Sequence, residues 1–445
     1  DHFGRKRIFQ YGILGFTLGS LLSALAQSST QLIVFQGLQG IGAAMMIPGS
    51  LAIINVCFAD NVRGKAIGLW AGLSGAMAAF GPLLGGWLVE EFGWSSVFWF
   101  NVPIGLLVYF AARSYVPESY NPDARHIDWL GTLFVGIGLS GLAFGLIQGP
   151  VWGWESGGIF VSFIVSAIAF ISFILVERMS EEPLVPFQIF KNPLVLGANI
   201  ATFLLYFALN GTIFFLTLNL QQIQGLSPFK TGLSLLPPVV IIALFSGPAG
   251  SLADRIGPRF QMITGPLAVA AGMGILAYSG PSPTYFANIL PGLILFGAGM
   301  AFTIAPLTKS ALAVKEKYSG VASGVNNAIS RIAGLMAVAI LGAVMFSFFT
   351  SKIEDRVQNL PIAKEQQEII LEQKDKLGGI QVPESFNSFA AKHTKTAIGE
   401  SFATGFKWIM IINGILAFVA AIIAFFEIKD SPELRYRKKR GEINT

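Results

Sequence analysis

The residues that most readily support metal or nucleophilic chemistry are widely separated in this sequence. His2, His126 and His393 lie in three separate polar stretches, and Cys57 is the sole cysteine. A metal centre needs clustered ligands, and a catalytic nucleophile needs a neighbouring base. The phosphate-binding pattern G-x-x-x-x-G-K-[ST] does not occur either. We therefore expect no enzyme activity, no cofactor, no metal site, no disulfide framework and no nucleic-acid partner.

The charged residues with an instructive spacing form the opening stretch DHFGRKR. Its Asp, Gly and basic residue recur 253 positions later in SLADRIGPR. A carboxylate there can accept hydrogen bonds from helix N-terminal amides or pair with a cation, and glycine permits a tight turn. We interpret both stretches as gating loops, although the cations alone would also serve membrane topology. The gating-loop residues are Asp1, Gly4, Arg5, Asp254, Gly257 and Arg259.

The elements that must position these loops are membrane helices. Hydrophobic residues make up 53% of the 445 residues and charged residues only 12%, whereas soluble proteins carry about 25% charged residues. The fold class is therefore an all-α membrane protein, because an apolar run of about 18 residues spans a bilayer as a helix. The twelve predicted spans are 8–26, 32–57, 66–89, 95–112, 129–147, 158–176, 194–222, 231–253, 260–279, 287–312, 319–349 and 406–426.

The distribution of Lys and Arg orients these spans. The short loops on the side of Arg5 hold nearly all of the short-loop Lys and Arg, whereas those on the opposite side hold Lys230 alone. The positive-inside rule then makes the Arg5 side and the C-terminus cytoplasmic. The long segment 350–405 lies outside, where "AKEQQEIILEQKDKLGGI" suggests a short polar helix that caps the molecule. We expect a multi-pass protein of the inner, cytoplasmic membrane.

Further similar segments accompany the repeated loop. "GLQGIGAAM" at 37–45 aligns with "GLILFGAGM" at 292–300, and "RGKAIGLWAG" aligns loosely with "SGVASGVNNA" at 319–328. Segments that recur in order at a nearly constant offset indicate two homologous halves in parallel orientation. The second half has two spans before its loop and the first has none. We therefore expect two preceding spans, hence fourteen in total.

These motifs resemble the major facilitator superfamily, and more narrowly its fourteen-span drug:proton antiporter branch. The opening loop resembles the signature between the second and third helices of that family. "LIVFQGLQGIGAAMMIPGSLAII" resembles the fourth-helix signature, and "GAMAAFGPLLGGWL" the antiporter signature of the fifth helix. The resemblance implies a major facilitator fold of two pseudo-symmetric six-helix bundles, the first lacking two helices here, plus two inserted helices.

The domains that follow from this reading have four parts. They are an N-terminal transporter bundle at 1–114, two linker helices at 115–192, a C-terminal six-helix bundle at 193–427 that includes the outer loop 350–405, and a basic cytoplasmic tail at 428–445.

The antiporter-like helix carries a face with almost no side-chain volume. Gly, Gly, Gly, Ala, Pro and Gly recur at helical spacing over 68–86, so that a partner helix can approach closely. Ordinary tight packing is one interpretation, and a seal at the outer end of a substrate pathway is the other. The residues assigned to this antiporter helix are Gly75, Gly81, Pro82, Gly85 and Gly86.

Polar residues within the apolar runs are the candidates for a substrate cavity. Gln36 departs from the family signature, which has Arg there, and this loss weakens the case for proton antiport. No carboxylate lies deep in a predicted span, although proton coupling needs a titratable group in the membrane. Arg331 is the charge farthest inside a span. The cavity candidates are Gln36, Gln39, Asn210, Gln221, Gln222 and Arg331.

The leading hypothesis is a secondary active exporter of lipophilic or amphipathic compounds that works by alternating access, with proton antiport. One alternative is an exporter of a specific metabolite or siderophore without proton antiport, and a more distant one is a non-transporting sensor or scaffold. The expected partners are a small-molecule substrate and the lipid bilayer. In a Gram-negative cell they would include a periplasmic adaptor and an outer-membrane channel.

Overall fold

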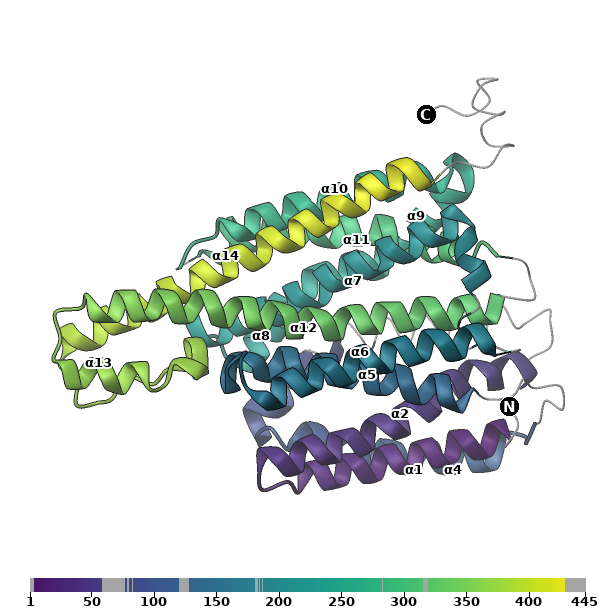
Figure 1. The fold of residues 1–445 in the computed structure, drawn as a ribbon, viewed down its shortest axis with the longest axis horizontal. Coiled ribbons are helices and arrows are strands. Elements are labelled where there is room, and N and C mark those ends of the chain that lie inside the picture. The colour runs from purple at the N-terminus through teal and green to yellow at the C-terminus, as the bar shows by residue number, and fades with distance from the viewer. Residues whose placement is uncertain are drawn as a thin grey trace. The chain divides into compact units, whose positions relative to one another are not determined.

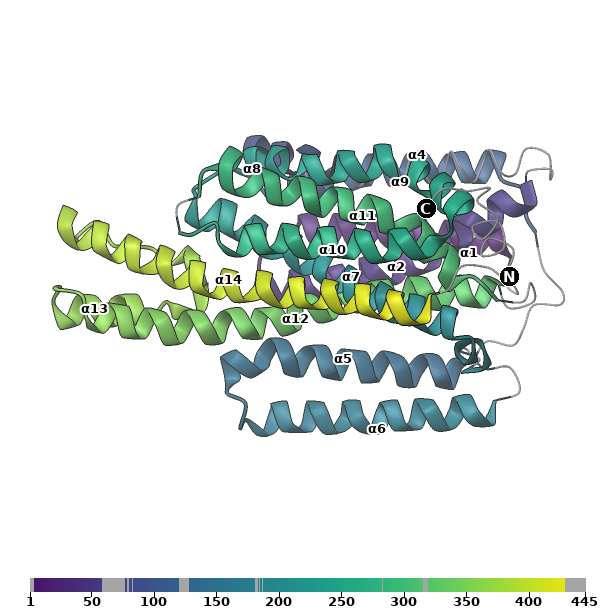
Figure 2. The same ribbon diagram turned by 90° about the horizontal axis from the view of Figure 1, so that it is seen from above.

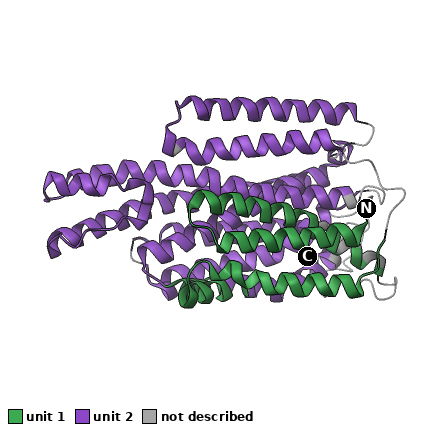
Figure 3. Ribbon diagram, turned by 90° about the horizontal axis from the view of Figure 1, so that it is seen from below, with its two compact units in different colours: residues 1–126, 227–236 green, residues 127–226, 237–445 purple. Residues whose placement is uncertain are grey.

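The computed structural model describes residues 4–57, 77, 80–81, 83–119, 128–180, 183, 185, 187–281, 283–314 and 319–428. Helices dominate these residues, and they contain no β-strand. Contacts divide the chain into two compact units, residues 1–126 with 227–236 and residues 127–226 with 237–445 (Figure 3).

The described residues of the first unit form four long or medium helical segments and one short helix. They are α1 (Arg5–Ala24), α2 (Ser29–Cys57), a helical stretch at 83–92, α4 (Ser96–Tyr115) and α8 (Pro228–Ser234). Within this unit α1 packs against both α2 and α4.

The second unit contains the remaining helices. They are α5 (Trp129–Trp152), α6 (Gly157–Met179), α7 (Pro193–Leu218), α9 (Leu236–Ile256), α10 (Pro258–Ala277), α11 (Leu290–Ala311), α12 (Ser319–Gln358), α13 (Lys364–Leu371) and α14 (Ser388–Glu427). Short 3-10 or π turns occur at Phe187–Lys191, Asn219–Ile223, Tyr285–Ile289 and Lys374–Gly379. Here α10 packs against α11 and α14, while α5 packs against α6 and α12 (Figures 1 and 2).

Most of the predicted spans appear as helices. Nine described helices are long and apolar enough to cross a membrane, and they coincide with nine of the twelve predictions. The first two predictions, 8–26 and 32–57, fall on α1 and α2, which have 20 and 29 residues. Most of the third, 66–89, lies outside the described residues. The membrane-spanning, all-helical fold is therefore confirmed for the part of the chain that the structure describes.

The helix boundaries follow from residues that satisfy free backbone amides. The first amides of a helix have no partner within it, so a side-chain acceptor just before the helix stabilises its start. The Asp128 carboxylate accepts a bond from Gly131 N at 2.7 Å, and Asn387 accepts one from Ala390 N at 2.7 Å. Asn192 caps α7 in the same way, with Pro193 at the first helical position, which proline favours.

The two halves share a close approach of helix backbones. A Cβ on Gly42 would meet the backbone oxygen of Gly12 at 2.7 Å, and one on Gly299 would meet that of Gly265 at 2.5 Å. The first contact joins α1 to α2 and the second joins α10 to α11. Glycine at these positions lets the backbones touch where any side chain would hold them apart.

These contacts also correct the register of the repeat. Gly12 and Gly265 are 253 residues apart, as the loops are, but Gly42 and Gly299 are 257 apart. The expected alignment of 37–45 with 292–300 used an offset of 255, so it is displaced by two residues. A third helix in each unit fits the repeat. Gly105 of α4 approaches Thr17 of α1, and Gly414 of α14 approaches Ala270 of α10, which lies 253 residues after Thr17.

The predicted outer loop 350–405 is shorter and more helical than expected. α12 and α14 each contain 40 residues and extend well past the ends of α7 and α10 (Figure 1). The predicted polar helix is present as α13, which joins them. Phe349, Ile353 and Ile370 are fully buried there, so apolar contacts between the extensions make this α12–α14 hairpin a folded element.

The glycine contacts lead to a stability prediction. We expect Gly299→Ala to lower the apparent melting temperature of the purified protein, because overpacking a tight contact costs about 1–3 kcal/mol. Gly274→Ala is the matched control on α10, since nothing lies within 4 Å of its added Cβ. The control should melt at the wild-type temperature or above it, because alanine favours helix by roughly 0.5–1 kcal/mol. Equal melting of the two variants would contradict the close approach.

Candidate functional site

The two loops for which the sequence predicts a gating role end on glycines with the same backbone conformation. Gly4 precedes α1 with φ 89°, and Gly257 precedes α10 with φ 94°. Both values lie in the left-handed region that glycine adopts without strain. Each loop therefore turns sharply into its helix at the position where the sequence indicated a turn. Asp1 lies outside the described residues, as does the side chain of Asp254.

A basic side chain just after each glycine holds the end of another helix. Lys6 donates from Nζ to the Arg113 carbonyl at 2.8 Å, and Arg259 donates from Nη2 to the Phe425 carbonyl at 2.9 Å. These carbonyls lie two residues before the ends of α4 and α14. Helix C-terminal carbonyls lack internal partners and carry partial negative charge, so a cation stabilises them. The contact is thus duplicated in the two units.

Other contacts distinguish the two loops. In the first unit Glu118 accepts a bond from Lys6 N at 3.1 Å and lies 3.7 Å from the Arg7 guanidinium, while Arg5 N donates to the Ser119 carbonyl. In the second unit the Arg259 guanidinium lies 5.0 Å from the centre of the Phe425 ring. Sequence reasoning missed Glu118, although a carboxylate shortly after the predicted span 95–112 and its flanking Arg113 was a usable signal.

The described part of the antiporter-like helix contacts α8. A Cβ on Gly86 would meet the Pro228 oxygen at 2.5 Å, and the Glu90 carboxylate accepts a bond from Phe229 N at 3.2 Å. Gly86 and Glu90 are one turn apart, so one helical face holds the start of α8. Gly81 and Gly85 have open space around them, whereas Gly75 and Pro82 lie outside the described residues.

The glutamines of α2 differ in their surroundings. Gln36 is exposed, but Gln39 is partly buried and donates from Nε2 to the Ser20 hydroxyl at 2.7 Å. Asn101 on α4 reaches the same hydroxyl at 3.4 Å. Gln39 therefore contributes to a polar junction of α1, α2 and α4, which membrane helices use to hold one another.

The candidates on and after α7 do not share one environment. Asn210 bonds to the carbonyl of Tyr206 at 2.8 Å and packs against Gly334 of α12. Gln221 and Gln222 fall in the π turn Asn219–Ile223, which changes the helical register beyond Leu218. Gln222 lines a separate pocket beside the α12–α14 hairpin, so the structure does not bring it together with Asn210.

Arg331 lies ten residues after the start of the apolar stretch Val321–Gln358 of α12 and is exposed. Asn327 precedes it by one turn and is exposed as well, while Gly324 and Leu335 continue the same face. No ion pair of Arg331 occurs among the described residues. A charge at that depth in a membrane is expected to face protein or a water-filled cavity.

Two buried polar junctions escaped the sequence analysis. Asn326 of α12 donates to Asn199 at 3.2 Å and to Thr202 at 3.0 Å, both on α7. Asn413 of α14 donates to Thr212 at 3.0 Å. The Oδ1 atom of Asn413 is buried without a hydrogen-bond partner. Asn and Thr within apolar runs were the available signal, but sequence alone does not pair them.

The described carboxylates of the spans lie near helix ends. Glu177 is buried two residues before the end of α6, and it accepts a bond from Val185 N at 3.2 Å. Glu354, Glu400 and the neighbouring acids belong to the extensions of α12 and α14. Within the described ranges, no three His, Cys, Asp or Glu side chains are grouped as a metal ion would require.

Comparison with known proteins adds a family assignment. The family described as Major Facilitator Superfamily matches residues 1–338. The multidrug resistance protein Stp of Mycobacterium tuberculosis is 33% identical over 360 residues, which cover 80% of this chain and 67% of that protein. The tetracenomycin C resistance and export protein of Streptomyces glaucescens is 29% identical over 98% of this chain and 81% of its own length.

Solved structures share the fold. A bacterial homolog of the human lysosomal transporter Spinster, in an inward-facing and unoccupied conformation, superimposes with a TM-score of 0.59 at 17% identity, over 96% of this chain and 85% of that one. The POT family transporter PepTSo gives a TM-score of 0.57 at 14% identity, over 99% and 85% of the two chains. At these identities the likeness concerns the fold alone.

The contact between Arg259 and Phe425 leads to a local prediction. We expect Arg259→Gln to accelerate amide hydrogen exchange in the last turns of α14, about fivefold or more, because a charge-assisted bond and a cation–π contact are each worth about 1 kcal/mol or more. Exchange in peptides covering 420–428, measured by mass spectrometry, tests this. Arg255→Gln removes an exposed charge from the same loop and should leave that exchange unchanged. Equal effects of the two variants would contradict a stabilising contact between Arg259 and the end of α14.

Proposed function

Because this chain belongs to the major facilitator superfamily, we propose that it is a secondary active exporter of lipophilic or amphipathic compounds. The observation that carries the proposal is the similarity to resistance proteins along most of the chain. Beyond the two relatives described above, a methylenomycin A resistance protein of Streptomyces coelicolor is 32% identical over 78% of this chain. A puromycin resistance protein of Streptomyces alboniger is 34% identical over 77% of it.

Alternating access by two related bundles is the mechanism we propose. In each bundle a glycine contact locks a helix pair, so the pair moves as one body rather than deforming. The gating loops then act within each bundle: Lys6 ties α1 to the end of α4, and Arg259 ties α10 to the end of α14, on the side that we propose is cytoplasmic. Breaking and remaking those bonds lets the cytoplasmic end open and close without loss of the bundle. The fourteen-span antiporter branch is part of this proposal.

The outer seal in this proposal is the contact of Gly86 and Glu90 with the start of α8. It joins a helix of the first half to a segment that the second half contributes, so its release would open the outer end. Asp254 and Asp1 would pair with the loop cations, and Gln36 and Arg331 would face the substrate.

Proton antiport is the coupling we propose, and one observation favours the alternative. The described spans carry their acids near the ends or in the extensions of α12 and α14, whereas a proton carrier belongs inside the membrane. An exporter of a specific metabolite that uses no proton gradient is therefore the second candidate. The inner, cytoplasmic membrane is the proposed location, with the C-terminus inside as the positive-inside rule requires.

Transport assays test the export proposal. We expect the protein in everted membrane vesicles to accumulate puromycin or ethidium when a proton gradient is imposed, because the exported compound enters such vesicles. Substrate addition should also release protons from the vesicle lumen, measured by the recovery of acridine dye fluorescence. Vesicles without the protein are the control. Accumulation without proton movement would support the second candidate, and absence of accumulation for every resistance-related compound would refute export.

Two adjacent glycines test the outer seal. We expect Gly86→Val to reduce initial transport rates at least tenfold, because its side chain would collide with the backbone of Pro228 and keep α8 away. Gly85→Val is the matched control, since nothing lies within 4 Å of its added Cβ. Equal amounts of both variants in the membrane must be verified by immunoblot. The seal is disproved if both variants transport at the wild-type rate.

A further inference from the structure

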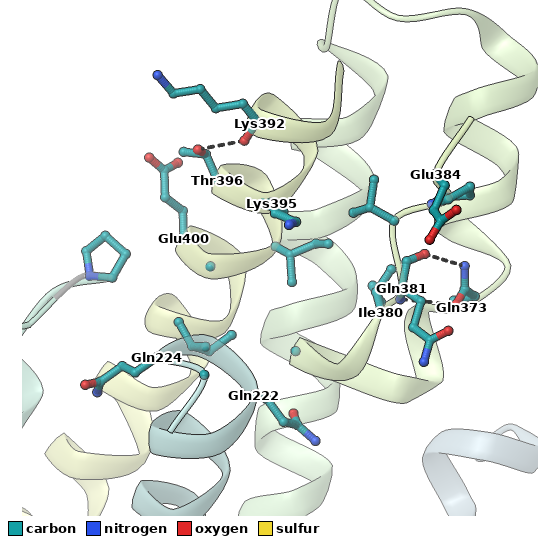
Figure 4. Close-up of a pocket in the computed structure, with 18 residues that line it drawn as sticks. Gln222, Gln224, Gln373, Ile380, Gln381, Glu384, Lys392, Lys395, Thr396 and Glu400 are labelled. Carbon is teal, nitrogen blue, oxygen red and sulfur yellow. Dashed lines mark hydrogen bonds between the residues drawn. The ribbon is translucent and has the colours of Figure 1, made fainter. Parts of the chain in front are cut away.

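A pocket of about 1030 Å³ lies at the base of the α12–α14 hairpin. Figure 4 shows α14 as one wall and the segment 373–384 as the opposite wall, with the end of α7 below them. All of these elements belong to the second unit. The volume is at the upper end of the range for small-molecule sites, about 300–1,000 Å³.

Hydrogen bonds hold the wall formed by 373–384. The Gln373 amide donates to the carbonyls of Ile369 and Gln381, each at 3.2 Å, and it accepts from Gln381 N at 3.3 Å. Gly378 sits against the π turn that follows α7, where an added Cβ would lie 2.7 Å from Ile223 Cδ1. The pocket is thus preorganised, which lowers the free energy that a ligand must supply to order it.

The pocket lining holds two lysines and two glutamates. Lys392 and Lys395 lie one turn apart on α14, and neither forms an ion pair among the described residues. Glu400 also lines the pocket, but its carboxylate lies 3.2 Å from the Arg356 guanidinium, which offsets its charge. Glu384 remains as the opposing carboxylate. Lys392 extends away from the 373–384 wall in Figure 4, so Lys395 is the better placed cation.

The rest of the lining is a mixture of amides and aliphatic groups. Gln222 offers an amide with donor and acceptor atoms, and Gln224 keeps its Oε1 atom available because its Nε2 bonds to Asn219. Aliphatic side chains, which favour an apolar ligand body, come from all three walls. They are Ile223, Ile380, Val382 and Ile398.

We propose that this pocket binds an amphipathic organic anion, with Lys395 as the charge that anchors it. The anionic group would accept from the Lys395 ammonium and the Gln222 amide, while the apolar body would cover the isoleucines. Such a site is separate from export, and the proposal does not depend on it.

Binding of 2-naphthalenesulfonate, a soluble amphipathic anion, tests the proposal. The full chain in phosphatidylcholine nanodiscs is dialysed to equilibrium against this probe. We expect Lys395→Gln to raise the Kd about tenfold, as loss of a charge-assisted hydrogen bond implies. Lys364→Gln is the matched control, since it removes an exposed cation from the same hairpin outside the pocket, and its Kd should be that of the wild type.

A second variant removes space instead of charge. Gly399→Phe places a ring in the pocket, where the added Cβ itself would lie 3.9 Å from Ile223, and we expect it to abolish binding. Neutral 2-naphthalenemethanol should bind at least tenfold more weakly than the sulfonate. Wild-type affinity in both Lys395→Gln and Gly399→Phe would overturn the proposal, and so would equal affinity for the two probes.

Nanodiscs that contain phosphatidylglycerol identify the source of the natural anion. If that lipid competes with the sulfonate for the wild-type protein but not for Lys395→Gln, an anionic lipid headgroup occupies the pocket and the anion site is supported. If binding is the same in both kinds of nanodisc, a soluble anion is the ligand and the site is supported equally. Competition that is independent of Lys395 would count against the proposal.

Discussion

The close approach of helix backbones at paired glycines is the constraint on which the rest of this structure depends. Lipid tails are as apolar as leucine, so burial of apolar side chains drives helix association in a membrane only weakly. Contact between backbones supplies the packing instead. Gly12 with Gly42 and Gly265 with Gly299 bring the helices together in the two units. The loops and polar junctions act on helices that these contacts have already positioned.

Polar side chains refine the arrangement that glycine makes possible. Ser20 receives bonds from Gln39 and Asn101, so three helices of the first unit meet at one hydroxyl. In the second unit the position equivalent to Ser20 is Met273, whose sulfur accepts from Thr212 at 3.1 Å. Thr212 in turn receives the bond from Asn413. Both junctions are thus centred on equivalent positions of α1 and α10, but the second recruits α7 where the first recruits α2, and the residue at the centre differs.

Helix ends give the protein its adjustable contacts. The cations at Lys6 and Arg259 bond to carbonyls that the helices themselves leave free, and such bonds exchange readily with water at a membrane surface. The glycine pairs cannot exchange in this way, because they are buried between helices. The cation contacts and the glycine pairs all lie within a unit, so each unit combines buried backbone contacts with contacts at its helix ends. α14 has such a contact near one end, where Phe425 bonds to Arg259, and its other end lines the pocket.

Composition and periodicity determined the class of this protein from sequence alone. Apolar runs of span length leave few alternatives to membrane helices, and the recurrence of Asp, Gly and a basic residue at an offset of 253 revealed two halves. The turns at Gly4 and Gly257 were predictable for the same reason, because a local conformation depends on local residues. The family resemblance followed from these motifs, and the superfamily is confirmed.

Only the tertiary structure decided which distant residues meet. The pairing of Lys6 with Arg113, of Gln39 with Ser20 and of Asn326 with Asn199 depends on helix rotation, which hydropathy does not encode. The two-residue change in register of the repeat and the π turn at Asn219 were also not predictable from hydropathy. Each rotates every later side chain on its helix. The α12–α14 hairpin was likewise not predictable from sequence. Its buried residues come from both sides of the segment 350–405, which the sequence indicated to be a polar loop.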